Sequence, residues 1–550
     1  MNNALFGYTG LVGSTLLTKY KFNYLYNSKN SNDARYKTFD TIVICCIPAV
    51  KWFANKFPNK DDEVIDYIKN IFKTITANHV ILISTIDIYD TTNNKSNEHT
   101  LINYNNNHTY GKNRYLFEVF IKEHFINYTI IRLPALFGQG LKKNIIYDLI
   151  NNNNINVIST NTSFQWYNLE WLKEDIDICI NNHIKECNLF TEPLDTIHIL
   201  NLFNYNYTNN PQTIVNYDTN TKYSAFFNST TNDYIRNKEL VFNDIKKFIV
   251  YQNNIVQKPC KYKLCVSNIS NNTLSNIHYY SILNYYGIKY IEIAPTKFYE
   301  WNLLFQNDEM KTIINETNKF DLTIYSFQSI TYTINNNIFD LDNSNLLNHC
   351  KNVIDLACNN KVKNLVFGCP RNRKILSNNT LYNETIFIDF MTELGNYISD
   401  RKLIISIENN SKSYNCNFLN TIDEVGMITL KINHPKIKMM VDIGNMIMEN
   451  DNLENIVNYK DIIYHIHIST PFMKPLNNLF CTGNSTSNSN NNSNSNNITY
   501  YKKFITILNQ IDYNKIISLE FLNNDENNDE NNELVNLNES LYNFINLFSM

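Results

Sequence analysis

Four side chains able to bind a metal ion stand at the ends of successive apolar segments in the second half of this 550-residue sequence. They are Glu408, Asp442, His467 and Glu520. A charged group in an apolar strand is costly unless it is paired or coordinated. Because the carboxyl ends of parallel barrel strands meet at one face, these groups predict a shared metal site. Three carboxylates with one imidazole are typical of Mn²⁺ or Mg²⁺, with Zn²⁺ and Co²⁺ as alternatives.

Eight short apolar segments position these side chains. Helical patterns alternate with them, and eight strand–helix units in fewer than 300 residues predict a (β/α)8 TIM barrel. The expected strands are 264–267, 290–294, 322–326, 364–367, 403–407, 438–441, 462–467 and 516–521.

Further polar residues lie close to these strand ends. Arg371 and Arg373 follow the fourth expected strand, where guanidinium groups are suited to hold a phosphate or carboxylate of the substrate. A surface pair that caps a loop is the alternative. His465 shares a strand face with His467, because side chains alternate along a strand. It is either a hydrogen-bonded core residue or a support for His467.

The barrel segments resemble the sugar-phosphate isomerase/epimerase branch of the xylose-isomerase-like barrels, across about residues 263–522. The resemblance includes segments 292–296, 327–329, 367–373 and 467–472. It implies a divalent ion on the four ligands above that binds vicinal oxygens of a ketose or aldose and stabilises an enediolate. It also implies that Glu408 and Glu520 act as base and acid.

One position departs from this family. Members often carry a histidine three residues after the aspartate ligand, and Asn445 stands there in this sequence, as a residue expected to contact the substrate. Nuclease-like relatives of the barrel use three zinc ions and need more histidines than these strand ends provide. The pattern therefore favours isomerase over nuclease chemistry.

The N-terminal part opens on a glycine-rich turn in a chain with only 12 glycines. Gly7, Gly10 and Gly13 follow a short apolar segment and open a helical one, with Leu11 and Val12 between them. This spacing is typical of turns that bind the pyrophosphate of NAD or NADP. The usual acidic ribose partner is missing, and Lys29 near its place favours NADP.

Apolar β-rich runs alternate with helical runs after this turn. The runs 4–6, 41–47, 80–84 and 129–133 have helical segments such as 63–78 and 113–124 between them. Such alternation predicts an α/β, Rossmann-like, doubly wound parallel sheet.

Together with the glycine turn, segments 81–89, 110–114 and 131–138 resemble the extended short-chain dehydrogenase/reductase family of sugar-nucleotide epimerases and reductases. The resemblance covers about residues 1–250. It implies that Thr85 or Ser84 and the hydroxyl of Tyr110 polarise the substrate, helped by a lysine four residues after the tyrosine. Arg114 occupies that position, and an arginine cannot shuttle a proton near neutral pH. The domain is therefore either catalytic with Arg114 in that role or a nucleotide-binding domain without efficient turnover.

Composition excludes several classes of function. The chain has 48 basic and 52 acidic residues, a net charge of −4, and no long basic run, which argues against nucleic-acid binding. No apolar stretch approaches about 18 residues, so we expect no membrane segment. Eleven cysteines, an odd number without a Cys-x-x-Cys pair, indicate reduced thiols in a cytoplasmic protein.

These patterns predict an NAD(P)-binding domain over 1–250, a linker over 251–262 and a barrel over 263–550. The Asn/Ser-rich segment 484–497 and the acidic segment 523–533 are expected to be solvated loops, because they lack apolar side chains. The expected function is a bifunctional enzyme of carbohydrate metabolism that acts on a sugar, sugar phosphate or nucleotide sugar, compatible with a homo-oligomer. The alternative is a non-catalytic nucleotide-sensing scaffold.

Overall fold

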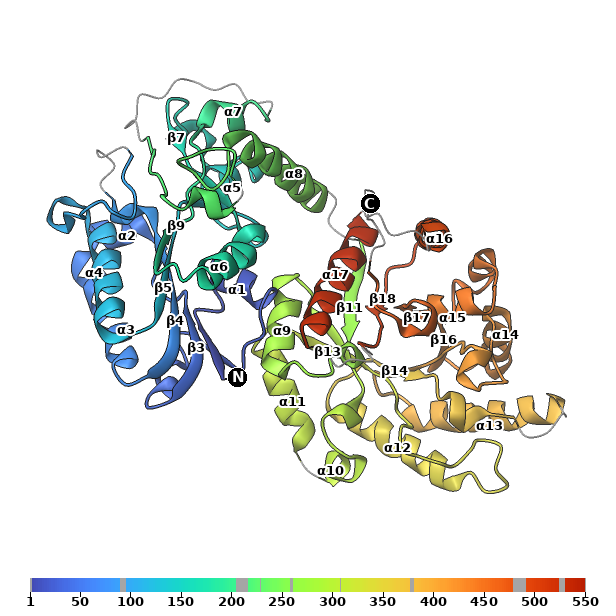
Figure 1. The fold of residues 1–550 in the computed structure, drawn as a ribbon. Helices are drawn as coiled ribbons and strands as arrows, with labels where there is room; N and C mark the ends of the chain where they lie inside the picture. Colours follow the sequence, from blue (N-terminus) through green and yellow to red (C-terminus); the bar gives the residue numbers. More distant parts are fainter. Residues whose placement is uncertain are drawn as a thin grey trace. The chain divides into compact units, whose positions relative to one another are not determined.

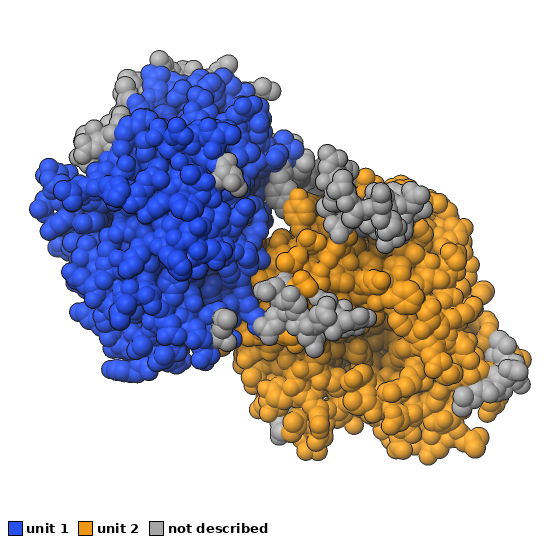
Figure 2. All heavy atoms as spheres, in the orientation of Figure 1, with its two compact units in different colours: residues 1–257 blue, residues 258–550 orange. Residues whose placement is uncertain are grey.

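The structure is a computed structural model that describes residues 2–89, 95–203, 216–227, 229–257, 261–306, 308–375, 380–477, 491–523 and 530–549. The chain divides into two compact units, Met1–Gln257 and Lys258–Met550. Figure 1 shows the helices and strands of each unit, and Figure 2 shows the residues that belong to each.

A six-stranded parallel sheet forms the centre of the first unit, in the order β2-β1-β3-β4-β5-β9. Its strands are β1 (Asn3–Phe6), β2 (Tyr24–Tyr26), β3 (Thr38–Ile44), β4 (Thr76–Thr85), β5 (Tyr128–Leu133) and β9 (Glu186–Asn188). Two short two-stranded pairings join β6 (Ala135–Phe137) to β8 (Trp166–Asn168) and β7 (Ser163–Phe164) to β10 (Leu194–Asp195). The predicted parallel sheet is therefore present.

Helices cover both faces of this sheet (Figure 1) because successive strand residues point to opposite sides. Leu5 packs in a core with Leu16 of α1 and Ile176 of α6. Phe6 packs in a second core with Ile65 of α3 and Phe117 of α4. The helices of this unit are α1 (Leu11–Leu17), α2 (Lys51–Lys56), α3 (Pro58–Phe72), α4 (Thr109–His124), α5 (Ile145–Ile150), α6 (Leu172–Asn181), α7 (Thr196–Leu200) and α8 (Lys238–Gln257). Helix α8 thus continues seven residues into the segment expected to be a linker.

The second unit is a closed barrel of eight parallel strands, which confirms the predicted (β/α)8 architecture. The last strand pairs with the first, with Leu519 opposite Val266. The strands are β11 (Lys263–Ser267), β12 (Tyr290–Ile293), β13 (Thr323–Phe327), β14 (Asn364–Phe367), β15 (Ile404–Ile407), β16 (Ile437–Asp442), β17 (Ile463–Ile468) and β18 (Ile516–Leu519).

Helices surround the barrel and share one apolar core with its strands. They are α9 (Asn276–Tyr285), α10 (Trp301–Gln306), α11 (Glu309–Asn318), α12 (Ser344–Asn359), α13 (Thr380–Ile398), α14 (Ile422–Ile432), α15 (Ile443–Met448), α16 (Asn491–Gln510) and α17 (Glu530–Ser549). Among the helices of the described residues, none is long and apolar enough to cross a membrane.

The two segments expected to be solvated loops are mostly helical where the structure describes them. Residues 484–490 and 524–529 lie outside the described part, but 491–497 begin α16 and 530–533 begin α17. Both helices bury apolar side chains further along, such as Phe504 and Leu537, and this packing carries polar residues ahead of them into the helix. Glu533 is itself buried, and its carboxylate accepts hydrogen bonds from the backbone N–H groups of Asn272 and Thr273.

Candidate metal centre and candidate pockets

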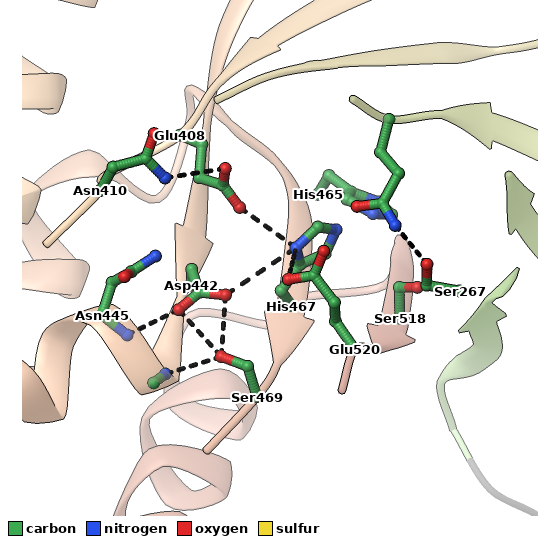
Figure 3. Close-up of polar contacts among 12 residues, drawn as sticks. Ser267, Glu408, Asn410, Asp442, Asn445, His465, His467, Ser469, Ser518 and Glu520 are labelled. Carbon is green, nitrogen blue, oxygen red and sulfur yellow. Dashed lines mark hydrogen bonds and ion pairs between the residues drawn. The ribbon is translucent and has the colours of Figure 1, made fainter. Parts of the chain in front are cut away.

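The four predicted metal ligands converge at one end of the barrel (Figure 3). Asp442 ends β16, His467 lies one residue before the end of β17, and Glu408 and Glu520 directly follow β15 and β18. One potential ligand atom from each side chain lies within 4.8 Å of those from the other three. All four side chains are buried. Parallel strands explain the convergence, because their carboxyl ends share one rim.

The imidazole of His467 lies at the centre of the cluster. Its Nδ1 lies 3.0 Å from Glu520 Oε2, 3.1 Å from Glu408 Oε1 and 3.8 Å from Asp442 Oδ2. Three carboxylates therefore surround one ring nitrogen in a buried environment.

Burial and mutual repulsion shift the protonation of this cluster. Burial, followed by the charges of Glu408 and Glu520, raises the pKa of Asp442 to about 8. Burial likewise raises the pKa of Glu520. For His467 burial lowers the pKa, but the carboxylates of Glu520 and Glu292 outweigh it and hold the pKa well above its ordinary value. A divalent cation relieves this repulsion, so the donor set fits such an ion.

A second set of buried side chains lies on the other side of the His467 ring. Glu292 of β12 places Oε1 2.9 Å from His467 Nε2 and Oε2 2.9 Å from His465 Nε2. All three side chains are fully buried. Burial raises the pKa of the Glu292 carboxyl, but the two imidazoles outweigh it and hold the pKa below its ordinary range. Glu292 is a residue that sequence reasoning did not assign; its one signal is a lone carboxylate within an apolar strand.

Helix α15 and the residue that follows β17 hold Asp442 in place (Figure 3). The backbone N–H of Asn445 donates to Asp442 Oδ1 at 2.6 Å, and the hydroxyl of Ser469 lies 2.9 and 2.8 Å from the two carboxylate oxygens. The Asn445 side chain donates to the Asn409 carbonyl and accepts from the Ser411 N–H. Asn445 lines the cavity, and its side-chain amide hydrogen-bonds within the chain. Ser469 was not singled out from the sequence.

A cavity of about 430 Å³ opens beside the cluster. Its wall includes Glu408, Asp442 and Glu520 together with Arg371 and Tyr414. A cavity of this volume falls within the range of small-molecule sites. The three carboxylates are therefore accessible to a ligand in the cavity.

The two predicted substrate-binding arginines differ in their surroundings. Arg371 is exposed and lines the cavity. Arg373 is fully buried, and its Nη2 donates to the Glu408 carbonyl at 2.8 Å and to Asn410 Oδ1 at 3.0 Å. The alternative of a surface pair is therefore wrong for Arg373, because its guanidinium is buried against the end of β15, which Glu408 follows.

The first unit contains a cavity of about 300 Å³ lined by Val12, Thr85, Tyr110 and Arg114 among others. Thr85 hydrogen-bonds Tyr110, whose burial raises the pKa to about 12 even though Arg114 lowers it. The Ser84 hydroxyl donates instead to Glu118 Oε1 at 2.6 Å. Of the two hydroxyl residues left open by the sequence, Thr85 is thus the one paired with Tyr110.

Arg114 is held by the chain from several sides. Its Nη1 lies 2.5 Å from Asp61 Oδ2 and its Nη2 lies 3.1 Å from Asp61 Oδ1, with both side chains buried. Its guanidinium carbon lies 3.9 Å from the centre of the Tyr110 ring. The charge at this position is therefore neutralised by a carboxylate that the sequence pattern did not reveal.

Another acidic group in this cavity was missed from the sequence. Asp87 Oδ1 lies 2.7 Å from Lys51 Nζ and accepts a hydrogen bond from the Tyr217 hydroxyl at 2.8 Å. Asp87 and Tyr217 both line the cavity. The partners lie 36 and 130 residues from Asp87, so local sequence gives no signal for the cluster.

Two of the three glycines in the N-terminal turn are required by packing. Gly7 has φ +90°, and a Cβ at Gly13 would lie 2.2 Å from the Gly7 carbonyl oxygen. Gly10 is less confined, with that oxygen 3.3 Å from an added Cβ. Leu11 and Val12 begin α1. Lys29 is exposed, outside the residues that line the cavity.

Comparison with known proteins identifies the barrel. The family described as xylose isomerase-like TIM barrel matches residues 282–538, which supports a xylose isomerase-like barrel for the second unit. Among solved structures, the chain is similar to D-allulose 3-epimerase from Methylomonas sp. (18% identity, 48% of this chain and 85% of that chain, TM-score 0.36). It is also similar to 3-keto-D-glucoside 4-epimerase from E. coli (12% identity, 52% of this chain and 99% of that chain, TM-score 0.38). A third similar structure is D-psicose 3-epimerase from Clostridium cellulolyticum (12% identity, 52% of this chain and 99% of that chain, TM-score 0.41). None of the curated proteins matches the sequence significantly.

Proposed function

We propose that the barrel is a divalent-metal-dependent isomerase or epimerase of a sugar or sugar phosphate. The observation that carries the proposal is the buried convergence of Glu408, Asp442, His467 and Glu520 beside a cavity of about 430 Å³. One cluster thus combines a metal-binding donor set with carboxylates that face a ligand.

The proposed ion, Mn²⁺, Mg²⁺, Zn²⁺ or Co²⁺, is held by these four side chains. When bound, such an ion polarises substrate oxygens and acidifies the C–H bond beside a carbonyl. Three oxygen donors and one nitrogen donor suit these ions. The hydrogen bonds from Ser469 and the Asn445 N–H orient Asp442 for this role.

Glu408 and Glu520 are the proposed acid and base. They come from β15 and β18, on either side of the two strands that carry Asp442 and His467. One carboxylate removes the proton from carbon and the other returns a proton at the new position or face. The Asn410 amide donates to Glu408 Oε2 at 3.0 Å and fixes that carboxylate.

The test combines metal analysis with proton exchange. We expect one divalent ion per chain and incorporation of solvent deuterium into a ketose or aldose from a panel of sugars and their phosphates. Glu408→Gln and Glu520→Gln should lose at least about 100-fold in rate, the low end of what general acid–base catalysis supplies. Glu393→Gln on α13, where the exposed carboxylate pairs with Lys351 of α12, is the matched control. Absence of a stoichiometric ion, or full activity in both glutamine variants, would refute the proposal.

For the first unit we propose NADP or NAD binding, with Thr85 and Tyr110 facing the nicotinamide end. The cavity that includes Val12 and Tyr110 supports this assignment. The ion pair between Arg114 and Asp61 favours nucleotide sensing over hydride transfer. A guanidinium does not release a proton near neutral pH, and the charge of Arg114 is already paired with a carboxylate. Titration with NADPH and NADH, followed by assay on a sugar-nucleotide panel, separates the alternatives. Turnover at rates typical of dehydrogenases would reject the sensing role, and no binding would reject both.

A further inference from the structure

Glu292 contacts both histidines of β17 from the far side of the metal-ligand cluster. Its Oε1 lies 2.9 Å from His467 Nε2, and its Oε2 lies 2.9 Å from His465 Nε2. His467 therefore has a different neighbour at each ring nitrogen, since its Nδ1 faces Glu408, Asp442 and Glu520.

The chemistry of the imidazole turns this contact into a constraint. A neutral imidazole has one N–H and one lone pair, and an ionised carboxylate only accepts hydrogen bonds. A cation bound at Nδ1, where the other carboxylates converge, would take the ring lone pair; the hydrogen then stands on Nε2, 2.9 Å from Glu292 Oε1. Histidine ligands of metals generally have such a partner for the second ring nitrogen.

We propose that Glu292 is a positioning residue that fixes His467 as an Nδ1 metal ligand. The inference rests on the proposed metal-dependent function of the barrel. Glu292 touches neither the cavity wall nor the ligand-facing side of the cluster; it acts through the His467 ring.

His465 secures the other oxygen of Glu292 and so completes the arrangement. The rings of His465 and His467 are 5.2 Å apart and inclined at 79°, which directs each Nε2 to a different oxygen of one carboxylate. The Ser518 hydroxyl lies 3.5 Å from Glu292 Oε1. Each carboxylate oxygen thus lies 2.9 Å from one imidazole, and these contacts fix the orientation of the His467 ring.

A second metal ion is the competing explanation for this group. Glu292, His465 and His467 place one potential ligand atom each within 4.8 Å of the others. An ion there would require His467 to lose the hydrogen from Nε2 while Nδ1 binds the first ion. The group is fully buried and offers three donors, and the close contacts of Glu292 with the two imidazoles explain the geometry without deprotonating the His467 ring to an imidazolate.

The experiment measures the His467 tautomer and Mn²⁺ binding in the full chain. Long-range ¹H–¹⁵N NMR on ¹⁵N-histidine-labelled protein loaded with diamagnetic Zn²⁺ should show hydrogen on Nε2 of His467, assigned with His467→Asn. Glu292→Ala should give a mixture of tautomers and weaken Mn²⁺ binding about 10- to 100-fold. Glu292→Gln keeps a carbonyl acceptor and most of the volume, so we expect the Nε2–H form with a smaller loss of affinity. The glutamine variant keeps the test decisive if the alanine variant does not fold.

The matched control is Ser326→Ala, which removes another fully buried polar group of the barrel, hydrogen-bonded to Asn364 at 3.1 Å. It should leave the tautomer and Mn²⁺ affinity unchanged. Hydrogen on Nδ1 in the native chain, or native affinity in both Glu292 variants, would overturn the proposal. Two ions per native chain and one in Glu292→Ala would overturn it in favour of the second metal site. A native chain that bound no divalent ion would refute the proposed function itself, whereas native-like binding in both Glu292 variants would refute only the role of Glu292.

Discussion

Replacement of Arg373 by methionine distinguishes a support for the strand end from a clamp for substrate phosphate. The buried guanidinium donates through Nη2 to the Glu408 carbonyl at 2.8 Å and to Asn410 Oδ1 at 3.0 Å. Methionine keeps an unbranched apolar chain of similar reach but donates no hydrogen bond. Both acceptors, which are buried, would then lose a charged donor.

The magnitude follows from these two hydrogen bonds. A hydrogen bond to a charged group contributes about 1.5–3 kcal/mol, so we expect a loss of about 3–5 kcal/mol in the stability of the barrel. At roughly 2–4 °C per kcal/mol, the barrel transition should move down by roughly 10 °C. Because Glu408 would lose its backbone support, Mn²⁺ affinity should fall in the variant under conditions where it remains folded.

Arg371→Met is the matched comparison. Arg371 is exposed and lines the cavity, so its replacement should change stability by less than about 0.5 kcal/mol. It should raise KM for a phosphorylated sugar more than for the unphosphorylated one. Calorimetry of both variants and KM measured on the pair of sugars provide the test. If Arg373→Met unfolded like the native protein and raised KM selectively for the phosphorylated sugar, Arg373 would be a phosphate clamp and the reasoning would be wrong.

Three further predictions address other parts of the molecule. Asp61→Asn leaves the charge of Arg114 buried without its partner and should destabilise the first unit by about 3–5 kcal/mol, measured by urea unfolding. Without metal the pKa of Asp442 is raised to about 8 and that of His467 is raised well above its ordinary value, so an ion must displace protons from these ligands. Mn²⁺ affinity should therefore rise with pH through about 8, and pH-independent affinity would contradict this. Gly13→Ala brings a Cβ to 2.2 Å from the Gly7 carbonyl and should unfold the first unit but leave Mn²⁺ binding to the barrel intact, as circular dichroism and metal titration will show.

The barrel and its rim of ligands follow from local patterns. Each strand is a short apolar segment, and the residue at its carboxyl end lies on the same face of the barrel in every strand–helix repeat. Glu408, Asp442, His467 and Glu520 could be predicted to converge because that relation needs no knowledge of how distant loops fold. The same local reasoning failed for residues 491–497, because composition does not reveal that a following apolar stripe extends α16 over them.

The contacts that the sequence did not reveal depend on side chains meeting across the fold. Glu292 and His467 lie on β12 and β17, which are not neighbours in the barrel, so strand order alone does not predict their contact. Arg114 and Asp61 are 53 residues apart on packed helices. Arg373 turns inward through the short helical turn Pro370–Arg373, which follows a left-handed residue, Cys369, at φ 48°.

The two arginines illustrate different consequences of such burial. Arg114 forms an ion pair with Asp61, so its positive charge is neutralised and adds little positive potential to the cavity beside Tyr110. Among the described residues, no carboxylate lies within ion-pair distance of Arg373, and its hydrogen-bond partners are neutral oxygens. Its positive charge is therefore free to act on the nearby acidic cluster, where it offsets part of the repulsion among three carboxylates. An arginine buried behind Glu408 thus stabilises the ionised ligand set through its charge as well as its hydrogen bonds, a role that lysine, without the planar fork, should fill only in part.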